Sequence, residues 1–132
     1  MLQSMQVKDY MIGDHLAFRP DTNVLDAIHQ LLQHHLSGAP VTDESGRLVG
    51  FLSEKDCLKI AVNASYFDGR GGMVQDFMAR EVVSLSAEAN LVDAIEIFIS
   101  KPYRCLPVVD DERVVGQIAR RDVLRAMEKL RR

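Results

Sequence analysis

A serine and an aspartate three residues apart stand where a short apolar run gives way to a helix. The stretch Gly50-Phe51-Leu52-Ser53-Glu54-Lys55-Asp56 predicts the end of a buried strand, a serine that caps the next helix, and a carboxylate in its first turn. A hydroxyl, free backbone N–H groups and a carboxylate at one helix N-terminus can seat a phosphate and the ribose beside it. The same spacing fits a capping box that would start any helix, so the spacing alone leaves both interpretations open.

The same arrangement recurs as Gly116-Gln117-Ile118-Ala119-Arg120-Arg121-Asp122. Here Ala119 stands in place of the hydroxyl, whereas the carboxylate of Asp122 is retained. Arg120 and Arg121 can substitute as phosphate ligands, since guanidinium groups bind phosphate oxygens in bidentate fashion. The alternative is an exposed basic helix start, which the helix dipole slightly disfavours. The sequence therefore predicts two related but unequal sites.

Other chemistries find little support in the residues present. The four histidines show no i, i+4 pair with a third ligand, so we expect no metal site. The stretch Gly69-Arg70-Gly71-Gly72 lacks the Gly-Lys-(Ser/Thr) ending of a P-loop. No Ser-His-Asp or Cys-His arrangement can be argued for, so we expect no catalytic residues and no enzyme activity.

These two stretches belong to an internal repeat that covers most of the chain. Residues of the first copy recur 67 positions later and, after a tighter second turn, 66 positions later. The matching residues are Val7/Val74, Asp9/Asp76, Met11/Met78, Asn23/Asn90, Asp26/Asp93, Pro40/Pro107, Asp43/Asp110, Gly50/Gly116 and Asp56/Asp122. We therefore divide the chain into a first repeat at 1–65, a linker at 66–73 and a second repeat at 74–132.

Each copy predicts a β-α-β-β-α unit. In the first copy we expect strands at 16–18, 39–42 and 47–52, and helices from Asn23 to Gly38 and from Ser53 to about Asn63. In the second copy we expect strands at 82–85, 106–109 and 113–118, a helix that Pro102 ends, and a last helix that carries Val123, Met127 and Leu130 on one face. The fold class is α+β, with two thin units packed around a pseudo-twofold axis to share one core.

The repeated order Pro-Val-x-Asp, turn, Gly-x-x-(Ser/Thr)-x-x-Asp resembles a tandem CBS-domain pair, also called a Bateman module. The segments that carry it are SGAPVTDESGRLVGFLSEKD and RCLPVVDDERVVGQIARRD, and the resemblance extends from about Val7 to Leu130. It implies a stand-alone regulatory module that binds an adenine-containing ligand (AMP, ADP, ATP or S-adenosylmethionine) in clefts between the repeats and signals to an unknown partner protein. No cofactor is required, and related pairs commonly form homodimers.

The resemblance also assigns roles to residues. Asp56 and Asp122 would accept hydrogen bonds from ribose hydroxyls, and Ser53 would meet the phosphate. Arg104 stands where related pairs often place a basic residue facing phosphates, whereas Ser37 takes its place in the first repeat. Candidate walls for the adenine are Ala17, Phe18, Ala39, Pro40, Val83 and Ser84, although ordinary core is the commoner role for such residues taken singly.

Composition restricts the partners. The net charge is −3, and the 13 residues from Arg120 to Arg132 carry five arginines and one lysine against two acids. No recognition motif supports a nucleic-acid contact by this basic helix.

The two cysteines have no CxxC or metal spacing, and neither a signal peptide nor a membrane-spanning run is expected, so we predict a cytoplasmic protein. The alternative function is a ligand-free dimerisation module with vestigial clefts, which Ala119 favours.

Overall fold

The computed structural model describes residues 1–13, 16–63 and 72–131. Most of the expected linker, residues 66–71, lies outside the described residues. The chain divides into two compact units, one formed by Leu16–Val82 and the other by Met1–His15 together with Val83–Arg132. We call them the Asp56 unit and the Asp122 unit, after the aspartates singled out above.

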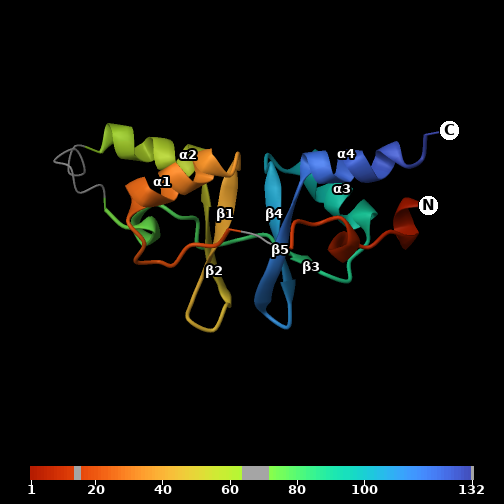
Figure 1. Cartoon of the computed structure of the whole chain (residues 1–132), viewed down its shortest axis with the longest axis horizontal. Helices are drawn as coiled ribbons and strands as arrows, with labels where there is room; N and C mark the ends of the chain where they lie inside the picture. The colour runs from red at the N-terminus through yellow and green to blue at the C-terminus, as the bar shows by residue number, and fades with distance from the viewer. Residues whose placement is uncertain (14–15, 64–71, 132) are drawn as a thin grey trace. The chain divides into compact units, whose positions relative to one another are not determined.

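The Asp56 unit contains a two-stranded antiparallel sheet and its helices (Figure 1). Its elements in chain order are α1 (Val24–Gln33), β1 (Gly38–Thr42), β2 (Leu48–Ser53), α2 (Glu54–Leu58), and the 3-10 helices η3 (Lys59–Val62) and η5 (Val74–Asp76). Phe18 extends this sheet by pairing in parallel with Val41, donating to the Pro40 carbonyl at 3.0 Å and accepting from Thr42 at 2.8 Å. The strand predicted at 16–18 is therefore a single bridge residue.

The Asp122 unit has a three-stranded sheet in the order β3-β4-β5. Its elements are the 3-10 helices η1 (Leu2–Ser4) and η2 (Val7–Asp9), then β3 (Leu85–Ser86), α3 (Leu91–Ser100), β4 (Cys105–Asp110), β5 (Arg113–Ala119) and α4 (Arg120–Glu128). The strand predicted at 82–85 is wrong in its bounds, since only Leu85 and Ser86 pair with β4. Each hairpin has one register irregularity, after Val41 and after Val108, which are repeat-equivalent.

The long helices begin where the sequence predicts caps. The side chain of Asn23 accepts from the N–H groups of Leu25 and Asp26 at 2.9 and 3.2 Å, and Asn90 and Asp93 cap each other reciprocally. These bonds satisfy N–H groups that have no partner inside the helix. Behind the caps, α1 buries Val24, Ala27 and Leu31, and α3 buries Leu91 and Ala94. The α1 helix ends at Gln33, before the predicted Gly38, and His35 follows with φ 54°.

Each repeat begins with a short segment that does not belong to the compact unit of its own repeat. It packs instead in the compact unit that consists mainly of the other repeat. Val7 donates to the Ala89 carbonyl at 2.8 Å, and its equivalent Val74 donates to the Thr22 carbonyl at 2.8 Å. Both valines are fully buried in the cores of those units. Figure 1 shows the first residues, in red, beside α3 and β3 of the Asp122 unit. We call Val7–Ile12 and Val74–Ala79 the exchanged segments.

Each exchanged segment also lengthens a sheet. Ile12 and Gln117 exchange backbone hydrogen bonds of 2.8 and 3.1 Å along β5, and Phe51 and Ala79 do the same at 2.9 Å along β2. The approach is close because the neighbouring strand residue is a glycine. A Cβ on Gly116 would lie 2.6 Å from the Ile12 carbonyl oxygen, and one on Gly50 would lie 2.9 Å from that of Ala79.

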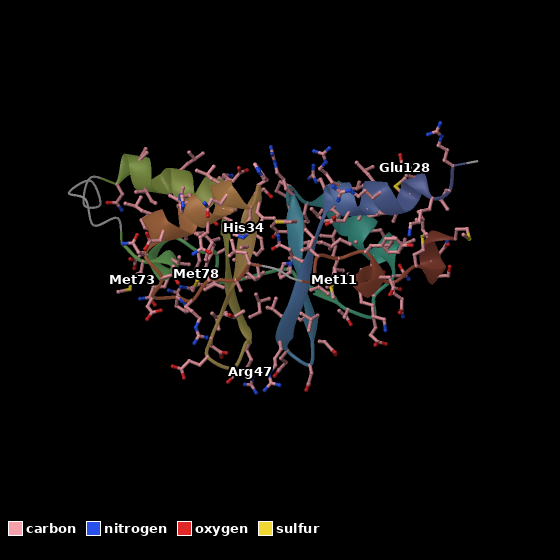
Figure 2. All side chains as sticks on the ribbon, viewed as in Figure 1. Met11, His34, Arg47, Met73, Met78 and Glu128 are labelled. Atoms are coloured by element: carbon pink, nitrogen blue, oxygen red, sulfur yellow. The ribbon has the colours of Figure 1, made fainter. Side chains whose placement is uncertain are left out.

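A methionine of each exchanged segment covers that glycine. Figure 2 labels the two residues, Met11 over the Asp122 unit and Met78 over the Asp56 unit. A Cβ on Gly116 would come within 2.7 Å of the Met11 sulfur, and a Cβ on Gly50 would collide with the Met78 sulfur. Gly50 and Gly116 therefore leave the space that the backbone and the methionine sulfur of the exchanged segment occupy.

The α+β fold class is confirmed: both units combine helices with a small sheet. The apolar face predicted for the last helix is buried only in part. Val123 is buried as expected, but Met127 and Leu130 are 40% and 41% exposed. The buried face of α4 consists instead of Asp122, Val123 and Ala126.

Candidate ligand-binding site

Asp56 lies in the first turn of α2, where β2 ends, and its carboxylate is buried in a network of local bonds. Its Oδ2 accepts from the backbone N–H and the hydroxyl of Ser53 at 3.1 and 2.9 Å, while its own N–H donates to Ser53 Oγ at 3.2 Å. This reciprocal pattern is a capping box, so the structural interpretation of Ser53-x-x-Asp56 is confirmed. The other carboxylate oxygen, Oδ1, accepts from Lys59 Nζ at 3.1 Å.

Asp122 repeats this arrangement at the start of α4. Its Oδ2 accepts from the backbone N–H of Ala119 at 2.7 Å, and its Oδ1 accepts from Arg125 Nη1 at 2.9 Å. The backbone angles at the two cap positions are nearly identical, φ −103° and ψ 166° at Ser53 and φ −109° and ψ 164° at Ala119. The missing hydroxyl therefore removes hydrogen bonds from this site but leaves its backbone geometry unchanged.

The predicted arginines gather near the start of α4. Arg120 donates from its backbone N–H to the Arg104 carbonyl at 3.2 Å and from Nε to the Tyr103 carbonyl at 2.8 Å. Its guanidinium also lies 6.0 Å from the ring centre of Phe98. Arg104 and Arg121 are exposed, and no hydrogen bond or ion pair to their side chains occurs among residues 1–13, 16–63 and 72–131. Arg104 thus directly precedes β4, and Arg120 and Arg121 directly follow β5, at the strand ends where Cys105 pairs with Ala119.

The predicted wall residues differ in exposure. In the Asp56 unit, Phe18 and Ala39 belong to the hydrophobic core and Pro40 is fully buried, whereas Ala17 is exposed. The carbonyl of Ser37 accepts from Glu54 N–H at 2.9 Å, which places Ser37 beside the start of α2. In the Asp122 unit, Val83 packs against the core and Ser84 is half-buried. Their contact with a ligand stays a prediction.

Sequence reasoning missed two residues that the structure places on the key carboxylates. Lys59 and Arg125 each lie three residues after the aspartate and are 66 positions apart, as Asp56 and Asp122 are. A basic residue at i+3 from an acid on a helix is a signal that could have found them.

Cys57 follows Asp56 and is half-buried. Burial is the main cause that raises the pKa of its thiol to about 11, and the negative charges of Asp56 and Glu54 contribute further. A thiol with this pKa is almost entirely protonated at neutral pH and is a poor nucleophile. This residue therefore gives no support to catalysis at the site.

Among residues 1–13, 16–63 and 72–131, no group of three or more His, Cys, Asp or Glu side chains is arranged to hold a metal ion. None of the helices described there has the length and apolarity needed to cross a membrane.

Comparison with known proteins identifies the family. The family model of the CBS domain matches residues 7–63 and 74–129, so this chain belongs to the CBS domain family and contains two copies of the domain. The resemblance predicted from the repeated segments is confirmed.

Two solved structures show the same fold over nearly the whole chain. The crystal structure of CBSX2 in complex with AMP, a protein of Arabidopsis thaliana, has a TM-score of 0.87 and 30% identity and covers 98% of this chain and 100% of that one. The CBS domain pair of protein MJ0100, in complex with 5′-methylthioadenosine and S-adenosyl-L-methionine, has a TM-score of 0.80 and 26% identity, with 96% and 98% covered. The ligands of both neighbours contain adenosine.

The curated relatives are longer proteins. An A-adding tRNA nucleotidyltransferase of Aquifex aeolicus is 31% identical over 95% of this chain, but the chain spans only 15% of that enzyme. The similarity therefore concerns the CBS pair within a larger protein.

Proposed function

We propose that this chain is a regulatory module that binds an adenosine-containing ligand, such as AMP, ADP, ATP or S-adenosylmethionine, and transmits its occupancy to a partner protein without catalysing a reaction. The observation that carries the proposal is the pair of repeat-equivalent buried aspartates, each at a helix start with one carboxylate oxygen outside the capping bond. Such an oxygen can accept hydrogen bonds from ribose hydroxyls. The adenosine ligands of the two structural neighbours support the same class of ligand.

The charges around the two aspartates support unequal preferences. Arg120 and Arg121 follow the cap of the Asp122 site, and Arg104 lies beside it, whereas Glu54 and Lys55 occupy the equivalent helix positions at the Asp56 site. Arginine is the side chain best suited to bidentate phosphate contacts. We therefore propose that phosphorylated ligands such as AMP prefer the Asp122 site and that the Asp56 site tolerates ligands without a phosphate.

Calorimetric titration of the full chain with AMP, ATP and S-adenosylmethionine tests the proposal. We expect binding of at least one ligand, with affinity reduced by Asp56→Asn or Asp122→Asn. Asn keeps an oxygen acceptor near the cap but removes the charge that strengthens hydrogen bonds from ribose. Absence of binding by the wild-type chain to all three ligands would favour the alternative, a ligand-free dimerisation module.

A matched control separates ligand contact from helix capping. Asp93 accepts from the Asn90 N–H at the start of α3, as Asp122 does from Ala119 at the start of α4. Asp93→Asn therefore weakens a cap of the same kind away from the proposed site. Equal losses of affinity in Asp93→Asn and Asp122→Asn would mean that the effect comes from stability alone.

We also propose that the chain forms a homodimer and acts in the cytoplasm. Exposed apolar side chains occupy equivalent helix positions in both units: Leu32 and Ile99 are 68% and 80% exposed, and Leu58 and Leu124 are 71% and 62% exposed. Apolar surface repeated in this way favours burial against a second copy of the chain.

A further inference from the structure

Both oxygens of each site aspartate are engaged within the chain, and they are engaged in different ways. In both units Oδ2 accepts from the cap residue, while Oδ1 accepts from a cation one helical turn later. The N···O distances of these ion pairs are 3.1 Å for Lys59 and 2.9 Å for Arg125. The cation therefore lies on the oxygen that the cap leaves available.

A ribose that binds this carboxylate must compete with the cation. A carboxylate offers about four lone-pair sites, and at Asp56 the backbone N–H and the hydroxyl of Ser53 already use two of them on Oδ2. The ribose hydroxyls are left with Oδ1, where Lys59 donates. At Asp122 the competition is weaker, because Ala119 has no hydroxyl and Oδ2 accepts only one bond from the cap residue.

The cation is the partner that can move. The side chains of Lys59 and Arg125 are 60% and 70% exposed, whereas those of Asp56 and Asp122 are 13% and 7% exposed. An exposed lysine or arginine can turn into water with little loss of solvation, but the buried carboxylate is fixed by the cap. Displacement of the cation therefore leaves the helix start intact.

We propose that Lys59 and Arg125 are affinity-setting residues that occupy the ribose-binding oxygen when the site is empty and are displaced when an adenosine-type ligand binds. This inference rests on the proposed function, because it assigns Oδ1 of each aspartate to ribose. The competition lowers the affinity for the ligand at both sites. The effect is larger at Asp56, because Ser53 already uses both lone pairs of Oδ2.

The test uses 5′-methylthioadenosine, which has the ribose hydroxyls but no phosphate, so that removing a positive charge does not remove an attraction to the ligand. Because the Lys59 end of the ion pair is 60% exposed and screened by water, we expect a small coupling energy, and Lys59→Met should tighten binding about two- to fivefold. Lys59→Arg restores the ion pair, as Arg125 forms it in the other unit, and should return affinity to the wild-type value.

Lys55→Met is the matched control, because Lys55 is an exposed lysine of the adjoining helix α2 that does not pair with Asp56. Arg125→Met and its control Arg131→Met repeat the test in the Asp122 unit, where we expect a smaller gain. Thermal unfolding verifies that each variant is folded, and Lys59→Gln serves if the methionine variant aggregates.

The outcomes separate this inference from the proposed function. Tighter binding by Lys59→Met but not by Lys55→Met supports it, as does binding that is measurable only after the cation is removed. Unchanged or weaker binding by Lys59→Met, with a wild-type chain that binds, overturns it and leaves the proposed function standing. If neither the wild-type chain nor any variant binds an adenosine compound, the proposed function is refuted and this inference with it.

Discussion

The substitution Gly116→Ala tests whether the exchanged segment Val7–Ile12 is held against β5 by close backbone contact. The new Cβ would lie 2.6 Å from the Ile12 carbonyl oxygen and 2.7 Å from the Met11 sulfur, whereas ordinary contacts begin at 3.4 Å. The carbonyl must therefore retreat by about 0.8 Å, the difference between these distances. Because this carbonyl accepts from Gln117 N–H at 3.1 Å, the retreat breaks that hydrogen bond and weakens its reciprocal partner.

The expected loss of unfolding free energy is about 2 kcal/mol, since overpacking a tight site costs about 1–3 kcal/mol and each backbone hydrogen bond contributes about 0.5–1.5 kcal/mol. Urea denaturation measures this loss. Amide hydrogen exchange of Ile12 and Gln117 reports on the segment itself and should accelerate.

Gly13→Ala is the control, because a Cβ there meets no atom within 4 Å. This substitution should leave stability unchanged or raise it by about 0.4–1 kcal/mol through the unfolded chain. Similar losses for Gly13→Ala and Gly116→Ala, or unchanged exchange at Ile12 in Gly116→Ala, would refute the close-contact explanation.

Three further predictions follow from individual contacts. With a thiol pKa of about 11, Cys57 should react with iodoacetamide at pH 8 roughly 100-fold more slowly than an ordinary cysteine, and a normal alkylation rate would contradict the raised pKa. Because the folded state keeps the thiol proton above pH 9, where the unfolded chain loses it, the free energy of unfolding should fall from pH 9 to 11. Deleting residues 1–13 should raise hydrogen exchange in α3 and α4 more than in α1, and the opposite order would contradict the unit assignment. The double variant Leu32→Glu/Ile99→Glu should sediment as a monomer if these side chains lie in the dimer interface.

Local sequence patterns predicted the elements well because their causes are local. The caps Asn23 and Asn90 act within one helical turn, and each hairpin consists of two apolar runs on either side of a short polar turn. The second hairpin loses one residue because Asp111 and Glu112 both adopt positive φ, 52° and 69°, which closes a two-residue turn. Such features need no knowledge of the rest of the chain.

The exchanged segments could not be predicted from the same patterns. Val7 is bonded to Ala89, far along the chain, and nothing in the Val7-Asp9-Met11 repeat indicates which unit it joins. The same limitation applies at α4: the spacing of Val123, Met127 and Leu130 indicates an apolar face, but the core meets α4 through Val123 together with Asp122 and Ala126. A buried aspartate and a small alanine are weak apolar signals, so periodicity favoured the larger side chains.

The site was predicted in part for a related reason. Ser53-x-x-Asp56 is a local pattern, and its capping geometry is present as expected. The role of Lys59 depends on competition between two partners for one carboxylate oxygen, which a sequence pattern does not show. Only the distances show that Ser53 donates to Oδ2 of Asp56 while Lys59 donates to Oδ1.

The exchanged segments provide a physical basis for the proposed regulatory role. Phe51, two residues before the cap Ser53, exchanges hydrogen bonds with Ala79, and the chain enters the Asp122 unit only four residues later, at Val83. In the other unit, Gln117 lies two residues before Ala119 and is bonded to Ile12, which precedes the start of the Asp56 unit at Leu16 by four residues. Each strand that leads to a proposed site is therefore bonded to a segment that continues directly into the other unit. A shift of either strand on ligand binding would therefore act on a segment that continues, within a few residues, into the other unit.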